Sequence, residues 1–375
     1  MRIQFVSLIP SYWGGSEVLW SEAAKALAQR QHAVSAFFAL YREHPALTAV
    51  QAAGVQLSYG TPPPLRWWRR LTHRSRPRLQ LLQHQWRRHR PNLVVFSQAA
   101  VRDGLEEMVV CSARGLRYAI INQLVEPLLP SAEFVGAFRR AYQQATRIWF
   151  VSEENRETVE HFLGQQLPNA AVIPNAYACR HDCSTIWPAT TLPLRAAMVA
   201  RLEPDQKGHG LLLGALREPR WRERPLQISV FGEGPARAEL QRQVQEFGLR
   251  QITFRGCASP DEIWTDHHAL LLPSRYEGQS LSLLEAMLHG RPAITTPVAG
   301  TRAVVIDGVT GFRAQGFALE HWLEVLERAW TARASWWELG AHAAAKVRQH
   351  VWPEPGQRMA DLIETLLQAD AEVAR

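Results

Sequence analysis

Two glutamates in the segment SRYEGQSLSLLEAMLHGRP, residues 274–292, carry the strongest chemical signal in the chain. Glu277 stands on an expected loop, where its carboxylate can accept hydrogen bonds from sugar hydroxyls. A helix is expected to begin near Ser280, and the free N–H groups of its first turn favour a phosphate or an anionic leaving group. Both glutamates have a structural alternative, because Ser282 and Glu285 have the spacing of a capping box and Glu277 suits a plain turn.

A pair of cations forms the second signal, in the segment VARLEPDQKGHGLLLGAL. Arg201 ends an expected strand and Lys207 opens a helix, so two positive charges meet at one strand–helix corner. Cations placed in this way can hold a diphosphate and stabilise the negative charge that develops on it. The alternative for Arg201 is a solvated surface side chain. Lys207 is unusual in type, because only three of the 42 Lys and Arg residues are lysines, the others being Lys25 and Lys346.

Glycine-rich turns give weaker signals. Gly14 and Gly15 follow the first expected strand, where glycines allow backbone N–H groups to approach a ligand, although a tight strand–helix turn also explains them. Gly232 and Gly234 follow a later expected strand. Arg237 replaces the third glycine of a dinucleotide fingerprint there, so we expect no nicotinamide site.

The cysteines are too few for a disulfide framework, which favours a reduced, cytosolic setting. They are Cys111, Cys179, Cys183 and Cys257. Cys179, His181 and Cys183 alternate along the chain and can be interpreted as metal ligands. A tetrahedral site needs four ligands, however, and no second Cys/His pair with metal-like spacing accompanies these three residues. We therefore expect no metal.

Alternating strands and helices must position these residues. Apolar runs of strand type, such as IQFVSLI and LVVFSQA, alternate with amphipathic helical segments, and a second series begins at Leu194. This alternation predicts an α/β fold built from βαβ units with parallel sheets. Residues 176–193 have no periodicity and are interpreted as a linker, and the C-terminal segment is one long amphipathic helix. We expect domains at 1–180 and 190–350, with the final helix at 353–375.

The composition excludes several classes of protein. With 46% apolar and 21% charged residues in 375, the chain is globular and long enough for two cores. No apolar run approaches the roughly 18 residues of a membrane span, and the N-terminus reads as a strand rather than a signal peptide. The net charge of +7 favours an anionic partner. Nothing resembles a motif that reads DNA, so nucleic acid is not the expected partner.

Residues 65–90 concentrate the positive charge. This segment holds nine arginines and three tryptophans, and no acidic residue lies between Glu43 and Asp103. Basic residues interleaved with tryptophan on a helix are typical of an interfacial membrane segment, so we expect contact with an anionic membrane surface. One alternative is a pair of solvated helices that cover the sheet with the tryptophans in the core. A phosphate-bearing acceptor is another.

The order of these motifs resembles glycosyltransferase family 4. The resemblance rests on the strings GGSE, RLEPDQKGH, VFGEGP, PSRYEGQSLSLLEAMLHGRP and DGVTG. It covers nearly the whole chain and is densest from Leu194 to Phe312. The resemblance implies a GT-B fold, with two Rossmann-like domains facing a cleft and the final helix crossing back to the first domain. It also implies a retaining transfer of a sugar from a nucleotide-sugar donor.

The resemblance also implies roles for individual residues. Arg201 and Lys207 would hold the donor diphosphate and Glu277 would contact the transferred sugar, so these three are the predicted catalytic residues. Glu285 would bind the ribose. The other donor contacts, with the base, the phosphates and the reacting sugar, are expected from Gly15, Gly256, Cys257, Gly278, Gln279, Ser280 and Leu281. No cofactor or metal is implied, because the chain has no Asp-x-Asp motif and the two cations would replace a metal's charge.

The acceptor side departs from the family. Asn122 and Gln123 stand where many members have a histidine, and they can hydrogen-bond a sugar but cannot titrate. Together with Trp13, they are the acceptor-side candidates. We expect a cytoplasmic enzyme, peripheral on the inner face of the membrane, that glycosylates a saccharide or lipid-linked acceptor in cell-surface glycan or glycolipid synthesis. The alternative is a GT-B protein that binds a nucleotide sugar with impaired turnover.

Overall fold

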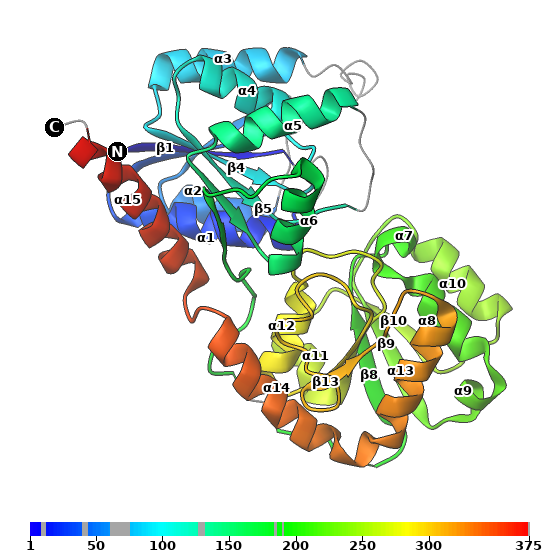
Figure 1. Cartoon of the computed structure of the whole chain (residues 1–375). Helices are drawn as coiled ribbons and strands as arrows, with labels where there is room; N and C mark the ends of the chain where they lie inside the picture. The colour runs from blue at the N-terminus through cyan, green and yellow to red at the C-terminus, as the bar shows by residue number, and fades with distance from the viewer. Residues whose placement is uncertain are drawn as a thin grey trace. The chain divides into compact units, whose positions relative to one another are not determined.

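The computed structural model describes residues 1–8, 13–39, 44–60, 76–126, 132–183, 186–189 and 191–373. The chain forms two compact units. The N-terminal unit comprises Met1–Ala176 and Glu354–Arg375, and the C-terminal unit comprises Tyr177–Pro353. Each unit has a parallel sheet with helices packed on it, so the predicted α/β class with two Rossmann-like domains is confirmed (Figure 1).

The sheet of the N-terminal unit has the strand order β3-β2-β1-β4-β5-β6-β7. Its strands are β1 (Arg2–Ser7), β2 (Ala33–Phe38), β3 (Gln56–Tyr59), β4 (Leu93–Gln98), β5 (Tyr118–Asn122), β6 (Arg147–Phe150) and β7 (Ala170–Val172). All are paired in parallel, with Phe5 of β1 opposite Ala36 on one side and Val95 on the other. Every residue of β4 and β5 is buried, which explains why these strands appear in the sequence as continuous apolar runs.

Helices cover both faces of this sheet. In Figure 1, α3, α4 and α5 lie above it, and α1 and α15 lie below it. The helices of the unit are α1 (Gly15–Gln29), α2 (Pro45–Ala52), α3 (Arg76–His89), α4 (Leu105–Ala113), α5 (Ala132–Gln144), α6 (Glu153–Leu163) and α15 (Pro355–Val373). The core on the upper face joins Leu82 of α3, Met108 of α4 and Phe138 of α5 to the strands beneath them.

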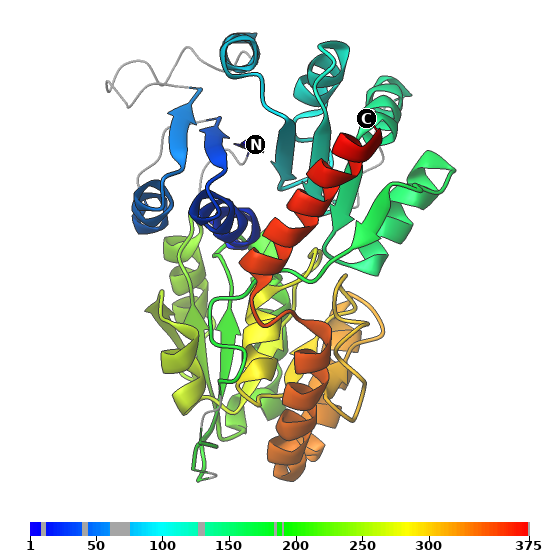
Figure 2. The same ribbon diagram turned by 90° about the vertical axis from the view of Figure 1, so that its left-hand side faces the viewer.

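The final helix α15 returns to the N-terminal unit, as predicted. It lies along α1 (Figure 2) and buries Met359, Ala360 and Ile363 at helical spacing. Charged groups join the two helices, because Arg30 Nη1 lies 2.7 Å from Glu364 Oε2 and 2.8 Å from an Asp361 carboxylate oxygen. This helix therefore ties residues more than 300 positions apart into one unit.

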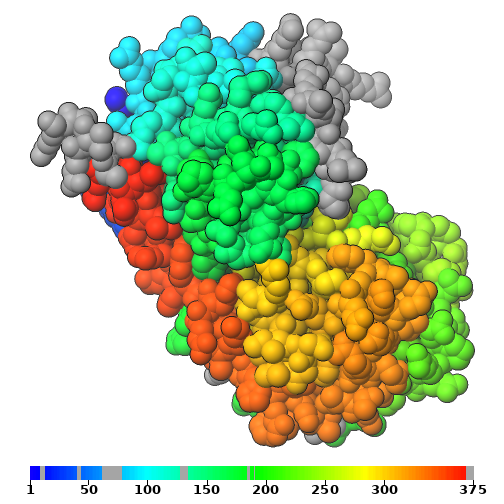
Figure 3. Space-filling view, viewed as in Figure 1, coloured from blue at the N-terminus to red at the C-terminus, as the bar shows by residue number. Residues whose placement is uncertain are grey.

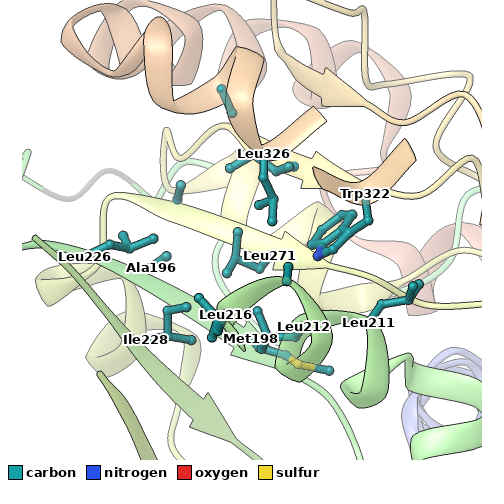
Figure 4. Close-up of a cluster of buried hydrophobic side chains, with 14 of the residues drawn as sticks. Ala196, Met198, Leu211, Leu212, Leu216, Leu226, Ile228, Leu271, Trp322 and Leu326 are labelled. Carbon is teal, nitrogen blue, oxygen red and sulfur yellow. The ribbon is translucent and has the colours of Figure 1, made fainter. Parts of the chain in front are cut away.

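The C-terminal unit repeats the architecture with the strand order β10-β9-β8-β11-β12-β13. Its strands are β8 (Leu194–Val199), β9 (Leu226–Phe231), β10 (Ile252–Gly256), β11 (Ala269–Leu272), β12 (Ala293–Thr295) and β13 (Gly311–Arg313). Its α-helices are α7 (Pro204–Lys207), α8 (His209–Arg217), α9 (Pro219–Glu223), α10 (Arg237–Glu246), α11 (Pro260–Asp266), α12 (Leu281–Leu288), α13 (Leu319–Thr331) and α14 (Trp336–His350). One face packs Met198 and Leu271 against Leu212 of α8 and Trp322 of α13 (Figure 4).

Residues 177–183, expected to belong to the linker, pack on the C-terminal unit instead. The Tyr177 side chain is buried and its hydroxyl donates to Trp352 O at 2.6 Å. Arg348 donates to the carbonyls of His181 and Cys183, which satisfies backbone groups that no strand or helix pairs. The segment has no periodicity because side chains from distant elements, rather than its own secondary structure, hold it.

Candidate active site

The strand order of the C-terminal unit brings the two strongest sequence signals together. Its adjacent strands β8 and β11 mark the point where the strand order reverses, and ligands of open α/β sheets bind at the carboxyl ends of such strands. Arg201 lies two residues beyond the end of β8, and Ser274 lies two residues beyond the end of β11. The candidate catalytic residues thus occupy the corner that this topology favours for a ligand.

Lys207 and Glu277 form an ion pair at this corner. The Lys207 Nζ atom lies 2.7 Å from Glu277 Oε1, and the side chains are only 14% and 7% exposed. Ser274 Oγ donates to the same carboxylate oxygen at 2.8 Å. The two charges stabilise each other in this buried position. Removing either one is expected to destabilise the protein, because the other charge would be buried without a partner.

Arg201 stands beside this pair and remains half-exposed. Its guanidinium donates to Glu203 and to Gln206 Oε1, each at 3.2 Å. The Gln206 backbone carbonyl accepts a hydrogen bond from the Arg275 backbone N–H at 2.8 Å, so Gln206 joins the corner after β8 to the corner after β11. The sequence motifs contain Gln206 and Ser274 but do not indicate either residue as part of the site. Arg201 is neither a free surface side chain nor buried.

Gly208 permits the close approach of the two corners. Its φ of +70° lies in the left-handed region, and a Cβ atom at this position would lie 1.8 Å from Pro273 O. The Pro273 carbonyl is part of the backbone, so it cannot move aside for a Cβ atom as the end of a flexible side chain could. Both the backbone conformation and the close contact with Pro273 therefore require a glycine next to Lys207.

Replacing Gly208 by alanine is expected to lower the free energy of unfolding by about 1–3 kcal/mol, because the methyl group overlaps the Pro273 carbonyl. Urea denaturation measures the change. Gly210→Ala is the matched control in α8, where a Cβ atom meets nothing within 4 Å, and it should gain about 0.5–1 kcal/mol. Equal losses in both variants would contradict this explanation of Gly208.

The predicted phosphate loop leads into α12. Gly278, Gln279 and Ser280 are buried, and Leu281 begins the helix with Ser280 as its N-cap. Gly300, on the loop after β12, packs against the Gly278 carbonyl, since its Cβ atom would lie 2.8 Å from that oxygen. Gly256 and Cys257 lie at the carboxyl end of β10 on the same edge of the sheet, and the Cys257 side chain is exposed.

The structure excludes the capping-box alternative for Glu285. The N-cap of α12 is Ser280, without a side-chain capping bond, so Ser282 and Glu285 lie inside the helix. The Glu285 carboxylate is buried and accepts a hydrogen bond from the Ala178 backbone N–H at 2.9 Å. Burial raises its pKa to about 7, although the bond from Ala178 acts in the opposite direction. A buried carboxylate with an available second oxygen can accept hydrogen bonds from ribose hydroxyls.

Two candidates of the N-terminal unit, Trp13 and Gly15, follow β1 at its strand-order reversal between β1 and β4, whereas Asn122 and Gln123 lie at the end of β5. Gly15 is the first residue of α1, and Trp13 stacks on His44 with ring centroids 5.2 Å apart. Glu17, which the GGSE string contains without a predicted role, is fully buried and accepts hydrogen bonds from Ser7 Oγ and the Trp20 indole. Glu17 anchors the start of α1 next to the glycine turn.

Asn122 and Gln123 are buried rather than displayed on the surface. Asn122 donates to the Tyr142 hydroxyl at 3.0 Å, and Gln123 accepts from Asn175 at 3.0 Å. In the part of the chain that the structure describes, Asn122 Oδ1 and Gln123 Nε2 have no hydrogen-bond partner. Because buried polar atoms are normally paired, one acceptor and one donor remain for a ligand.

Comparison with known proteins finds a family match in the C-terminal unit. Residues 193–331 match the family model of the glycosyl transferases group 1. The match lies entirely within the C-terminal unit. The matched residues contain Arg201, Lys207, Glu277 and Glu285, so the group 1 match covers the candidate donor site except Gly15, which lies in the N-terminal unit.

Two curated relatives of the chain are bacterial glycosyltransferases by name. An alpha-D-kanosaminyltransferase from Streptomyces kanamyceticus is 32% identical over 226 residues, which cover 56% of each chain. The D-rhamnosyltransferase WbpZ of Pseudomonas aeruginosa is 29% identical over 149 residues, or 38% of each chain. The chain thus spans about half or less of the curated relatives that it matches.

Solved structures extend the likeness in fold to both units. The Anabaena protein HepE, in complex with UDP and glucose, matches with a TM-score of 0.74 at 16% identity, over 96% of this chain and 99% of that one. A sucrose-phosphate synthase from Thermosynechococcus elongatus matches with a TM-score of 0.75 at 17% identity, over 98% and 99%. These matches confirm the predicted GT-B type of fold.

Proposed function

We propose that this protein is a retaining glycosyltransferase that moves a sugar from a nucleotide-sugar donor to a saccharide or lipid-linked acceptor. The observation that carries the proposal is the buried Lys207–Glu277 ion pair beside Arg201, at the strand-order reversal of a group 1 glycosyl transferase unit. The names of the curated relatives support sugar transfer, and HepE holds UDP and glucose. A role in cell-surface glycan or glycolipid synthesis belongs to the same proposal.

The residues of the group 1 unit divide the chemistry between them. Arg201 and Lys207 stabilise the leaving diphosphate as negative charge develops on it, and the backbone N–H groups at the start of α12 add to this effect. Glu277 contacts hydroxyls of the transferred sugar, while Lys207 and Ser274 hold its carboxylate. An oxygen of the leaving diphosphate takes the acceptor proton on the same face of the sugar, so no separate general base is required.

A thermal-shift panel of nucleoside diphosphates and nucleotide sugars tests donor binding. The true donor should stabilise the protein by about 2.7 kcal/mol at 100 times its Kd. Arg201→Ala should reduce the shift, because its guanidinium is exposed and its loss leaves no buried charge. If no nucleotide raises the melting temperature, the proposal is wrong.

Nucleoside diphosphate release distinguishes transfer from binding without turnover. The measurement uses the stabilising nucleotide sugar with and without candidate saccharide acceptors. Release that depends on an acceptor supports the transferase. Tight binding with no release under any acceptor would favour the alternative, a nucleotide-sugar-binding protein with impaired turnover.

We further infer that the basic surface of α3 binds an anionic membrane. Arg87 and Arg88 are exposed in the last turn of this helix, which forms the top of the N-terminal unit in Figure 3. The expectation for Trp86 is wrong, because its side chain is only 2% exposed and its indole donates to Gln4 at 2.6 Å. Residues 65–75 of the predicted segment lie outside the described residues. No helix among the described residues is long and apolar enough to cross a membrane.

Changing Arg87 and Arg88 together to glutamine is expected to weaken binding to anionic vesicles about tenfold to thirtyfold, since each basic residue contributes about 1 kcal/mol near such a surface. Vesicle co-sedimentation measures the change. Arg220→Gln with Arg222→Gln removes the same charge from α9 and should change binding less. Equal, weak sedimentation of the wild type on anionic and neutral vesicles would rule out the membrane contact.

A further inference from the structure

A pair of thiols lies next to the candidate ribose-binding carboxylate. Cys179 and Cys183 are free cysteines in the segment 177–183, and their Sγ atoms are 3.8 Å apart. A backbone hydrogen bond from Cys183 N to Arg180 O turns the chain so that the two side chains meet. The residue before Cys179 is Ala178, whose N–H donates to Glu285 Oε1 at 2.9 Å.

His289 presents a positive charge to Cys183. Its Nδ1 atom lies 2.7 Å from the Glu285 carbonyl oxygen and 3.6 Å from Cys183 Sγ. Its Nε2 atom lies 2.9 Å from Asp261 Oδ1. A carbonyl and a carboxylate oxygen can only accept, so both ring nitrogens donate and the ring is an imidazolium. Burial opposes this charge, but the bonds with Cys183 and Asp261 outweigh it and raise the pKa of His289 to about 9.

Cys183 is the thiol that this environment activates. The hydrogen bond with Cys179 lowers the pKa of the Cys183 thiol most, burial opposes the shift, and the bond with His289 lowers it further. Arg348 adds a second positive charge nearby and donates to the Cys183 carbonyl at 2.8 Å. The thiolate is the nucleophilic form of cysteine, and neighbouring cations favour it. The same contact raises the pKa of the Cys179 thiol, whereas Cys183 is the thiol that lies beside His289.

Metal binding is the less favoured use of these side chains. Among the described residues, the candidate ligand cluster has three members, Cys179, Cys183 and His289. A structural zinc site takes four ligands, and histidine binds through a nitrogen lone pair. Both nitrogens of His289 donate to oxygen acceptors here, so the ring would have to give up a bond in order to ligate.

We propose that Cys179 and Cys183 form a reversible disulfide that regulates nucleotide binding through the contact between Ala178 and Glu285. The regulatory part rests on the proposed role of Glu285 in donor binding. Closing the bond brings the sulfurs from 3.8 Å to about 2.05 Å, and we expect the backbone next to Ala178 to take up part of this movement. The Ala178 N–H, which donates to Glu285 in the reduced protein, then shifts. The position of the Glu285 carboxylate changes with it.

The oxidant is a hydroperoxide. The Cys183 thiolate attacks one peroxide oxygen, the O–O bond breaks, and the products are a sulfenic acid on Cys183 and, after protonation, water or an alcohol. The Cys179 thiol then loses its proton and attacks the Cys183 sulfur, the S–O bond breaks, and hydroxide leaves to become water. The cysteine pair is oxidised by two electrons and the peroxide is reduced by two. A dithiol reverses the reaction by exchange.

Thiol mapping of the full chain tests the disulfide. Hydrogen peroxide should remove two hydrogen atoms from the mass of the wild type and protect Cys179 and Cys183 from alkylation. Cys111→Ala, in the core of the N-terminal unit, should behave as the wild type, whereas Cys183→Ser should not form the bond. Cys179→Ser should accumulate a sulfenic acid that dimedone traps. Cys179 and Cys183 that remain open to alkylation after peroxide, or thiols shielded by stoichiometric zinc, would overturn the proposal.

Nucleotide affinity tests the regulation. The probes are UDP, GDP and ADP, and the tightest of them is compared between the reduced and oxidised protein. Oxidation should change its Kd at least about fivefold, dithiothreitol should restore it, and Cys179→Ser should show no such reversible change. Equal affinity in both states overturns the regulation. If none of the three binds the reduced protein, the donor proposal fails, while the mass measurement still decides the disulfide.

Discussion

Replacing Lys207 by methionine is expected to lower the rate of sugar transfer about 10²–10³-fold, because one charge that stabilises the leaving diphosphate is lost. The same change should lower the free energy of unfolding by about 3–5 kcal/mol, since Glu277 is left buried without its partner. Steady-state kinetics and urea denaturation measure the two effects.

A double variant separates the two effects. Lys207→Met with Glu277→Gln removes both charges and should regain most of the stability while remaining inactive. Lys25→Met is the matched control, because Lys25 pairs with Glu22 on the surface of α1 and its loss should cost at most about 1 kcal/mol. If Lys207→Met keeps the wild-type kcat, Lys207 does not hold the diphosphate.

Replacing Glu285 by glutamine is expected to stabilise the protein above pH 7 and to weaken nucleotide binding. Burial raises the pKa of Glu285 to about 7 in the folded state, from an ordinary value of 4.5. The unfolded chain therefore releases this proton at lower pH than the folded one, and the wild type loses stability as the pH rises from about 4.5 to about 7. The loss amounts to about 3 kcal/mol and stays constant at higher pH.

Glutamine keeps an oxygen for the Ala178 N–H but carries no charge, so the variant should be more stable than the wild type by about 3 kcal/mol at pH 8 and nearly equal at pH 4.5. Its nucleotide affinity at pH 8 should fall about tenfold to 100-fold, since charged hydrogen bonds to the ribose are lost. Urea denaturation across pH and nucleotide titration measure these changes.

Glu223→Gln, at an exposed glutamate of α9, is the control and should show no such difference across pH. A pH-independent difference between Glu285→Gln and the wild type would contradict the burial of the charge. Unchanged nucleotide affinity would remove Glu285 from the ribose site, and the stability result would stand by itself.

Local patterns predicted the elements and most of the candidate donor site. Apolar runs such as β4 and β5 indicated buried parallel strands, because both faces of such strands are covered. The amphipathic spacing of residues 353–375 predicted α15. Arg201 and Lys207 were expected at one corner, and the structure places both at the strand-order reversal of the C-terminal unit.

Other local patterns misled, because the deciding contacts were not local. Ser282 and Glu285 have the spacing of a capping box, but α12 begins two residues earlier than that reading requires. Trp86 belongs to a segment with the composition of an interfacial helix. The side of α3 that carries it nevertheless faces the sheet, and its indole donates a hydrogen bond to Gln4. Residues 177–183 resemble a linker only because their hydrogen-bond partners lie far along the chain.

The sequence by itself determined the α/β class, many of the strands and helices and the residue types that suit a nucleotide sugar, since these follow from periodicity and short motifs, but it indicated neither α2 nor β3 nor β13. Only the tertiary structure decided which of those residues form ion pairs and hydrogen bonds with one another. Lys207 and Glu277 are 70 residues apart and Ala178 and Glu285 are 107 apart, and parallel strands with crossover helices bring such pairs together. The physical reason is that burial and ion pairing set the free energy of a charged side chain, and both depend on neighbours from other elements.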